Sequence, residues 1–139
     1  MIHGLKYLYL DSFQLTDTTA IRKLSNLENL TLNSCNQLSK VYFPDSAHSL
    51  KYISLSYCEN LEQISTEILN EELIKFNINN TGFTTLPILP GVKKINDYTC
   101  NNCKKLKNLK GLSGLISITN YKYGNSWIGF EGCTNLEDI

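Results

Sequence analysis

The sequence predicts a mainly β, right-handed solenoid with few short helical turns and a parallel sheet on its concave face. The first observation is the stretch from Leu50 to Ile64, whose apolar residues fall at relative positions 1, 4, 6, 9, 12 and 15. Neither a helix nor a simple strand has that spacing. The second is recurrence, because the same pattern starts at Leu5, Leu27, Leu50, Leu73 and Ile95. These starts are almost equally spaced, and a period of about 22–23 residues indicates stacked coils.

Each predicted coil has a short strand with inward apolar side chains, followed by a corner. A lone coil leaves its apolar side and both edges of its strand exposed. Stacking the coils buries the apolar sides and pairs the strand edges in a parallel sheet. The inward residues of the first five copies are Leu5, Leu8, Leu10 and Phe13; Leu27, Leu30, Leu32 and Cys35; Leu50, Ile53, Leu55 and Cys58; Leu73, Phe76, Ile78 and Thr81; and Ile95, Tyr98, Cys100 and Cys103. We therefore expect one domain over 1–139 that contains six repeats, each of about 22–23 residues.

The last repeat, at 111–139, is irregular. The segment 133–139 repeats the pattern of 58–64, and counting back from Cys133 puts a strand near Ile128 and Phe130. The period, however, places the sixth strand near Ile118. Gly124-Asn125 between the two segments is typical of a turn. The repeat therefore carries an insertion or folds as a hairpin, and we prefer the hairpin.

The connectors predict a mostly non-helical outer face. Thr16 to Leu24 can hold one helical turn, capped by Thr16 or Asp17. Pro44, Pro87 and Pro90 make later connectors extended or irregular.

Composition narrows the classes of partner and compartment. The formal net charge of zero argues against nucleic acid or an anionic membrane surface, which require a basic excess. Six late lysines are interpreted as a solvated edge: Lys93, Lys94, Lys104, Lys105, Lys107 and Lys110. The N-terminus lacks the features of a signal peptide. Five cysteines, an odd number, fit poorly with a closed disulfide framework. We expect a cytoplasmic protein, or an extracellular one if the chain is a fragment.

The candidate chemical motifs favour structural roles. Cys100-Asn-Asn-Cys103 has the spacing of a redox or zinc motif, but in repeat register both sulfurs point into the core. Cys35, Cys58, Cys103 and Cys133 share one corner position and should form a ladder of thiols. His3 and His48 have no partners at a spacing that suggests catalysis. We therefore expect no enzyme activity, no cofactor and no metal.

These motifs resemble the leucine-rich-repeat superfamily over almost the whole chain. The segments 92–109 and 130–139 resemble the BspA-type (Treponema-type) repeat, and the segment 15–27 resembles internalin-type repeats. Cys100 stands where the BspA-type pattern usually has Phe, and Thr81 where it has a corner Cys or Asn. The resemblance implies a curved solenoid that binds proteins, often at host–microbe or cell-surface contacts. It brings no catalytic residues.

The expected binding surface is the concave sheet, whose outward residues alternate with the buried ones. Its candidate contact residues are Tyr7, Tyr9, Asp11, Asn33, Tyr52, Ser54, Tyr57, Asn77, Asn79, Thr99 and Asn101, and Ser56 is expected on the same face. Tyr supplies contact area at low entropic cost, and amides hydrogen-bond adaptably.

We expect a non-enzymatic module that binds a protein on this face. The alternatives are a carbohydrate-binding surface, with Tyr stacking on sugar rings, and a structural fragment of a longer solenoid. Uncapped Leu5, Leu8 and Leu10 further predict self-association through a terminus.

Overall fold

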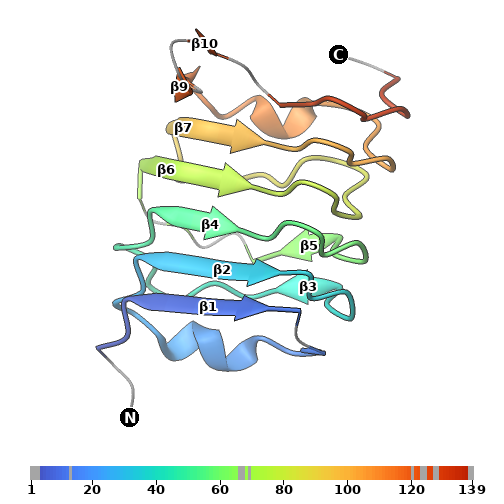
Figure 1. Cartoon of the computed structure of the whole chain (residues 1–139). Helices are drawn as coiled ribbons and strands as arrows, with labels where there is room; N and C mark the ends of the chain where they lie inside the picture. Colours follow the sequence, from blue (N-terminus) through green and yellow to red (C-terminus); the bar gives the residue numbers. More distant parts are fainter. Residues whose placement is uncertain are drawn as a thin grey trace.

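The computed structural model describes residues 4–12, 14–65, 68, 70–119, 121–122, 125–126 and 129–137. Its main element is a six-stranded parallel sheet in the order β1-β2-β4-β6-β7-β8 (Figure 1). The strands are β1 (Tyr7–Asp11), β2 (Asn29–Asn33), β4 (Tyr52–Ser54), β6 (Glu72–Asn77), β7 (Lys94–Thr99) and β8 (Ser117–Ile118). Each successive coil adds one strand to the sheet, so the predicted solenoid of parallel strands is confirmed.

The register of the sheet aligns equivalent positions of successive repeats. Leu30 of β2 is in register with Leu8 on one side and Ile53 on the other, and Phe76 continues the row to Tyr98. The Phe76 and Tyr98 rings meet edge to face with their centroids 5.1 Å apart. The Phe130 ring lies 6.1 Å from that of Tyr98, but in register Phe130 stands opposite Cys100. The predicted period thus corresponds to a continuous row of inward side chains.

The core lies between this sheet and the connectors behind it. The four repeats that begin at Leu27, Leu50, Leu73 and Ile95 bury these residues completely. Leu5, Leu8 and Leu10 of the first repeat are only partly buried, because β1 lies at the edge of the sheet and has one neighbouring strand.

The rear of the solenoid has little regular structure. A short parallel pair, β3 (Lys40–Val41) with β5 (Gln63–Ile64), lies there, and isolated bridges join Ala47 to Ile68 and Thr85 to Asn108. Two 3-10 turns, η1 (Thr19–Lys23) and η2 (Lys110–Leu112), complete it. The Asp17 carboxylate accepts hydrogen bonds from the hydroxyl and backbone of Thr19, which lowers the pKa of Asp17. Within the described residues no helix has the length and apolar character needed to cross a membrane.

The corners that follow the strands contain left-handed backbone residues. Positive φ angles occur at Ser12, Ser34, Tyr57, Asn80, Asn102 and Gly132. Amides at these corners bond to neighbouring coils, as when Tyr57 N–H donates to the Asn79 carbonyl at 2.9 Å. Asn tolerates this conformation better than most residues. At Gly132 the positive φ of 73° favours glycine.

The sixth coil contains both an insertion and a hairpin-like strand pair, the two alternatives that the sequence left open. β8 pairs with the start of β7, Ser117 with Lys94, as the period predicts. A bridge then pairs Gly129 with Thr99 at the end of β7. The difference in residue number between partners is 23 in the first pair and 30 in the second, so seven extra residues lie between the two halves of the strand. That insertion holds an antiparallel pair, β9 (Tyr121–Lys122) with β10 (Asn125–Ser126).

The expectations for His3, Phe13, Gly124 and Ile128 fall outside the described residues.

Candidate binding face

The outward side of the main sheet, called here the open face, presents tyrosine rings. The relative exposures of Tyr7, Tyr9, Tyr52 and Tyr57 are 55%, 61%, 38% and 56%. Tyr7 and Tyr52 are both in register with Asn29, so they share one row two strands apart. Tyr57 belongs to a corner rather than a strand, and it extends the aromatic surface along the margin of the sheet.

Asp11, also predicted for this face, is exposed at the end of β1. Thr99 is half-buried at the end of β7. The six lysines of the predicted solvated edge are all exposed.

The polar residues between the tyrosines bond to one another. The Asn33 side-chain oxygen accepts hydrogen bonds from the hydroxyls of Ser54 and Ser56, each at 3.0 Å. The Asn77 amide donates to the Ser56 hydroxyl at 3.5 Å. Ser56, which was expected on this face, is only 7% exposed because these side chains cover it. Its hydroxyl lies within this network, between two neighbouring strands.

A second set of asparagines links the corners. The Asn79 side-chain oxygen accepts from the Asn101 backbone N–H at 2.6 Å, and the Asn101 side-chain oxygen accepts from Glu131 N–H at 3.0 Å. Asn79 N–H in turn donates to the Asn77 side chain at 3.0 Å. Buried or half-buried backbone donors need such partners. The predicted contact residues Asn33, Ser54, Asn77, Asn79 and Asn101 are therefore all half-buried and take part in these polar networks.

Sequence reasoning missed a hollow of about 450 Å³ on the open face beside Tyr52. It is lined by Tyr52, Ile74, Lys75, Asn96, Asp97 and Thr119. Ile74 and Asn96 were missed because β6 and β7 each place two consecutive half-buried residues between their inward ones, which breaks simple alternation.

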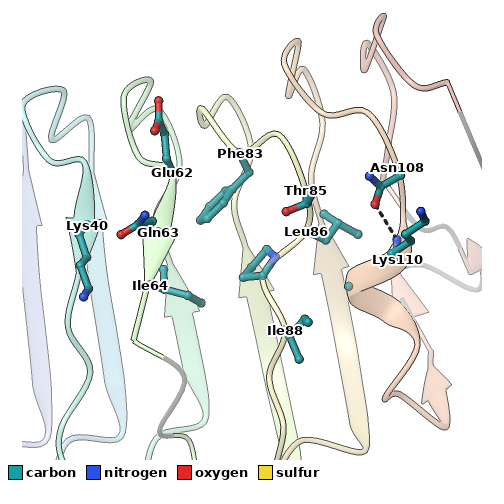
Figure 2. A pocket seen from close by; sticks show the side chains of 12 residues that line it. Lys40, Glu62, Gln63, Ile64, Phe83, Thr85, Leu86, Ile88, Asn108 and Lys110 are labelled. Carbon is teal, nitrogen blue, oxygen red and sulfur yellow. Dashed lines mark hydrogen bonds between the residues drawn. The ribbon is translucent and has the colours of Figure 1, made fainter.

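A larger hollow of about 640 Å³ lies on the rear, next to β5 (Figure 2). Ile64, Phe83, Leu86 and Ile88 give it an apolar lining, and Ile88 is 59% exposed. Lys40 and Lys110 add positive charge to its lining, and Glu62 adds negative charge. At one side, the Asn108 side chain accepts a hydrogen bond from Lys110 N–H at 3.1 Å.

Three of the corner cysteines donate hydrogen bonds to the coil before them, whereas Cys35 Sγ donates to the Asn33 carbonyl of its own coil at 3.6 Å. Cys58 Sγ donates to the Leu32 carbonyl at 2.9 Å, Cys103 Sγ to the Ile78 carbonyl at 3.1 Å, and Cys133 Sγ to the Cys100 carbonyl at 2.9 Å. Burial raises the pKa of Cys58 to about 11. The predicted thiol ladder is therefore present, and a thiol suits the corner because it is small and can donate to a buried carbonyl.

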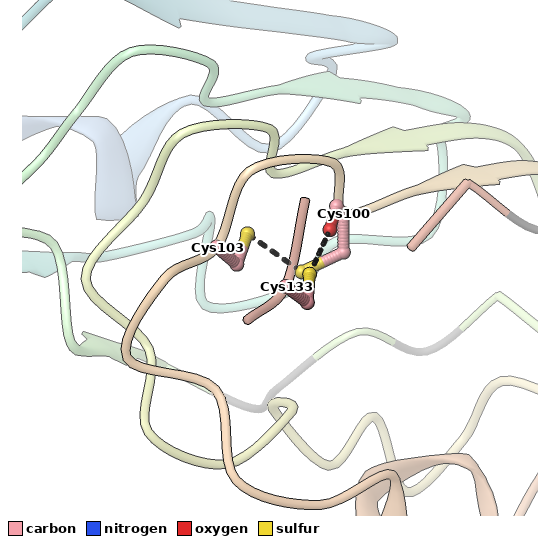
Figure 3. Close-up of side chains that lie close together, drawn as sticks. All are labelled: Cys100, Cys103 and Cys133. Carbon is pink, nitrogen blue, oxygen red and sulfur yellow. Dashed lines mark hydrogen bonds between the residues drawn. The ribbon is translucent and has the colours of Figure 1, made fainter. Parts of the chain in front are cut away.

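Cys100 adds a third sulfur next to two of these corners. Its Sγ lies 2.7 Å from that of Cys103, to which it donates, and Figure 3 shows Cys133 beside both. This hydrogen bond lowers the pKa of Cys103, and it raises that of Cys100, which is the buried donor. Burial also raises the pKa of Cys133.

Stacked parallel coils with inward leucines and Cys or Thr corners define a leucine-rich-repeat solenoid. The chain belongs to the BspA-type leucine-rich-repeat family: the model of the BspA type leucine rich repeat region matches residues 5–137 in six copies. The resemblance expected from 92–109 and 130–139 is thereby confirmed. Proteins with such repeats are typically binding modules.

A 44-residue segment, 32% of this chain, is 46% identical to a protein of Arabidopsis thaliana described as a probable disease resistance protein. The segment spans only 4% of that relative's length. No solved structure matches the chain significantly.

Proposed function

We propose that this chain is a non-enzymatic module that binds another protein on the open face of the main sheet. The observation that carries the proposal is the group of four exposed rings, Tyr7, Tyr9, Tyr52 and Tyr57. Strands in a sheet are about 4.8 Å apart, so the rings of Tyr7 and Tyr52 stand roughly 10 Å from each other. Exposed aromatic side chains grouped at this spacing are suited to act as anchors, since Tyr is enriched among binding hot spots.

The rings stand on a surface that does not need to rearrange. The Asn33, Ser54 and Ser56 network and the Asn79–Asn101 contact link neighbouring coils below and beside them. Binding to a preorganised surface costs less conformational entropy than binding to a mobile one. The asparagines therefore support recognition by fixing the sheet, while the tyrosines supply the contact area.

The charges on this face are balanced. Lys6 pairs with Glu28 at 3.1 Å near Tyr7, and this hydrogen bond raises the pKa of Lys6. Asp11, Lys75 and Asp97 add both signs along the sheet. Such a face suits a protein partner of mixed charge better than a polyanion, which requires a basic stripe.

Site-specific photo-crosslinking tests the proposal. A photoreactive phenylalanine analogue would replace Tyr52 in one sample and exposed Lys104 in the matched control. We expect crosslinks to one discrete partner from position 52 and none, or only diffuse ones, from position 104. Crosslinks to a discrete partner from position 104 alone would place recognition on the lysine edge and contradict the proposal.

Carbohydrate binding is a second candidate because of the hollow beside Tyr52. An aromatic ring beside Asn96, Asp97, Thr119 and Lys75 combines a stacking surface with hydrogen-bonding groups. A glycan array separates the two candidates: reproducible binding that is lost in both Tyr52→Ala and Asp97→Ala would favour a sugar. Protein crosslinking from position 52 without any glycan signal would favour a protein.

We also propose a reducing compartment, because five cysteines, an odd number, fit poorly with a closed disulfide framework.

A further inference from the structure

Three thiols from two coils converge where the sixth coil rejoins the solenoid. The Sγ atoms of Cys100, Cys103 and Cys133 all lie within 4.8 Å of one another (Figure 3). Cys100 and Cys103 come from the corner that follows β7, whereas Cys133 comes from the corner after the seven-residue insertion. The shared corner position already places Cys133 beside Cys103, and the structure adds that Cys100, three residues before Cys103, lies close to both.

The repeat itself does not require a thiol at position 100. The equivalent residues of the three preceding coils are Leu32, Leu55 and Ile78, and all three are fully buried. If position 100 served only to fill the core, an aliphatic side chain would be sufficient there. The other corner thiols, Cys35 and Cys58, belong to no such group of three among the described residues. The cysteine at position 100 therefore adds a third sulfur to the neighbouring corner thiols Cys103 and Cys133, and the three form a triangle.

We propose that Cys100, Cys103 and Cys133 form a binding site for a thiophilic d¹⁰ metal ion, of which Zn²⁺ is the probe of choice. Thiolates are soft ligands that favour such ions over hard cations such as Mg²⁺ or Ca²⁺. A zinc ion can take three protein ligands and one water. The three sulfurs are buried, and Cys133 is the one residue of the three that is partly exposed, so an ion would enter beside it. The triangle thus revises the expectation, drawn from the sequence, that these cysteines serve packing alone.

The distances suit such an ion after a small movement. Zn–S bonds of about 2.3 Å in tetrahedral geometry place sulfurs roughly 3.8 Å apart. The three sulfurs already lie within 4.8 Å, so the main change is that Cys100 and Cys103 separate by about 1 Å from their present 2.7 Å. Rotation about the side-chain bonds of either cysteine can provide it.

Binding exchanges three S–H bonds for three metal–sulfur bonds. Each thiol loses its proton to solvent, so one Zn²⁺ and three thiols give a singly negative complex and three released protons. The hydrogen bonds that Cys100, Cys103 and Cys133 donate are lost in the exchange. The Ile78 carbonyl nevertheless keeps a partner, because the Thr81 hydroxyl also donates to it at 2.7 Å.

The metal would fasten the sixth coil to the fifth across the insertion. The described strand pairings of the sixth coil with β7 are short: β8 against the start of β7, and the Gly129 bridge at its end. This role is independent of the proposed binding face, which lies mainly on β1, β2 and β4.

The test uses the full-length chain, reduced and stripped with a chelator, to which Zn²⁺ is added. We expect one equivalent to bind, with proton release measured by calorimetry in buffers of different ionisation enthalpy, and a rise in Tm. Cys100→Leu gives position 100 an aliphatic residue like those of the three preceding coils. It removes one of three ligands, so it should weaken binding by at least the roughly tenfold loss typical of changing only an outer-shell group. Cys58→Ser, at an equivalent corner outside the triangle, should bind Zn²⁺ like the wild type.

Three results would overturn the proposal. The first is a folded wild type that takes up no stoichiometric Zn²⁺, and the second is a Cys100→Leu variant that binds as tightly as the wild type. If Cys100→Leu does not fold, Cys133→Ser serves in its place and must lose binding. The third is an intact mass lower by two hydrogens in the untreated protein, reversed on reduction and mapped to Cys100 and Cys103, which would assign these thiols to a disulfide instead.

Discussion

Tyr7 and Tyr52 occupy the same row of the main sheet, two strands apart, and both rings are exposed. Asn29 lies between them and is in register with each. Side chains in such a row point the same way from neighbouring strands, so a ligand that covers one ring also approaches the other. This geometry follows from the nearly equal spacing of the repeat starts at Leu5, Leu27 and Leu50, and it links the repeat pattern directly to the proposed binding face.

Leu55→Asp tests the repeat register. Leu55 is fully buried between neighbouring coils, and an unpaired carboxylate there should cost more than about 4 kcal/mol in free energy of unfolding. We expect the variant to be unfolded by circular dichroism. A variant with wild-type ellipticity and melting would contradict the inward assignment of this row.

Asn33→Ala tests the structural role of the polar network on the open face. The substitution removes the acceptor of both the Ser54 and Ser56 hydroxyls and should cost about 1–3 kcal/mol of stability. Asn36→Ala, at an exposed position in the following corner, is the matched control and should change stability little. Urea titrations compare the two. Equal midpoints for Asn33→Ala and wild type would show that the network contributes nothing.

We expect the buried thiol of Cys58 to make the protein less stable against unfolding at alkaline pH. Burial raises its pKa from 9.0 to about 11, so between these values the folded state keeps a proton that the unfolded state releases. The free energy of unfolding therefore falls as pH rises from about 9 to about 11. Cys58→Ser, which retains a donor for the Leu32 carbonyl but does not titrate in this range, should lose less stability over the same interval. The same slope in both proteins would contradict the assignment.

The edge strand β1 predicts self-association. Among the described residues it lies at the end of the sheet order, and its own inward side chains, Leu8 and Leu10, are only partly buried. Sedimentation should therefore reveal a dimer whose fraction rises with concentration. Leu8→Lys, whose charged end can reach solvent at this half-buried position, should shift the equilibrium to monomer. A wild type that stays monomeric at the highest concentration would contradict the expectation.

The period of the sequence was enough to place Leu27, Leu50, Leu73 and Ile95 in the core, because an inward row needs only periodicity. It could not show that asparagines bond across coils, because a period gives the side on which a residue lies but not its partners. The burial of Ser56 was missed for the same reason.

The approach of Cys133 to Cys100 was hidden for a different reason. The shared corner position placed Cys133 beside Cys103 despite the seven inserted residues, but a repeat position does not give the distance between the sulfurs of Cys133 and Cys100.

The most direct test of the proposed binding face is calorimetry with a crosslinked and then purified partner at one salt concentration. Tyr52→Ala and Tyr7→Ala should each keep the wild-type Tm, because the rings are exposed, and each should lose about 2 kcal/mol of binding free energy. Lys104→Ala and Lys105→Ala should leave the affinity nearly unchanged and alter only its salt dependence. If the tyrosine variants bind like the wild type while the lysine variants lose affinity, recognition occurs at the lysine edge and not on the open face of the sheet.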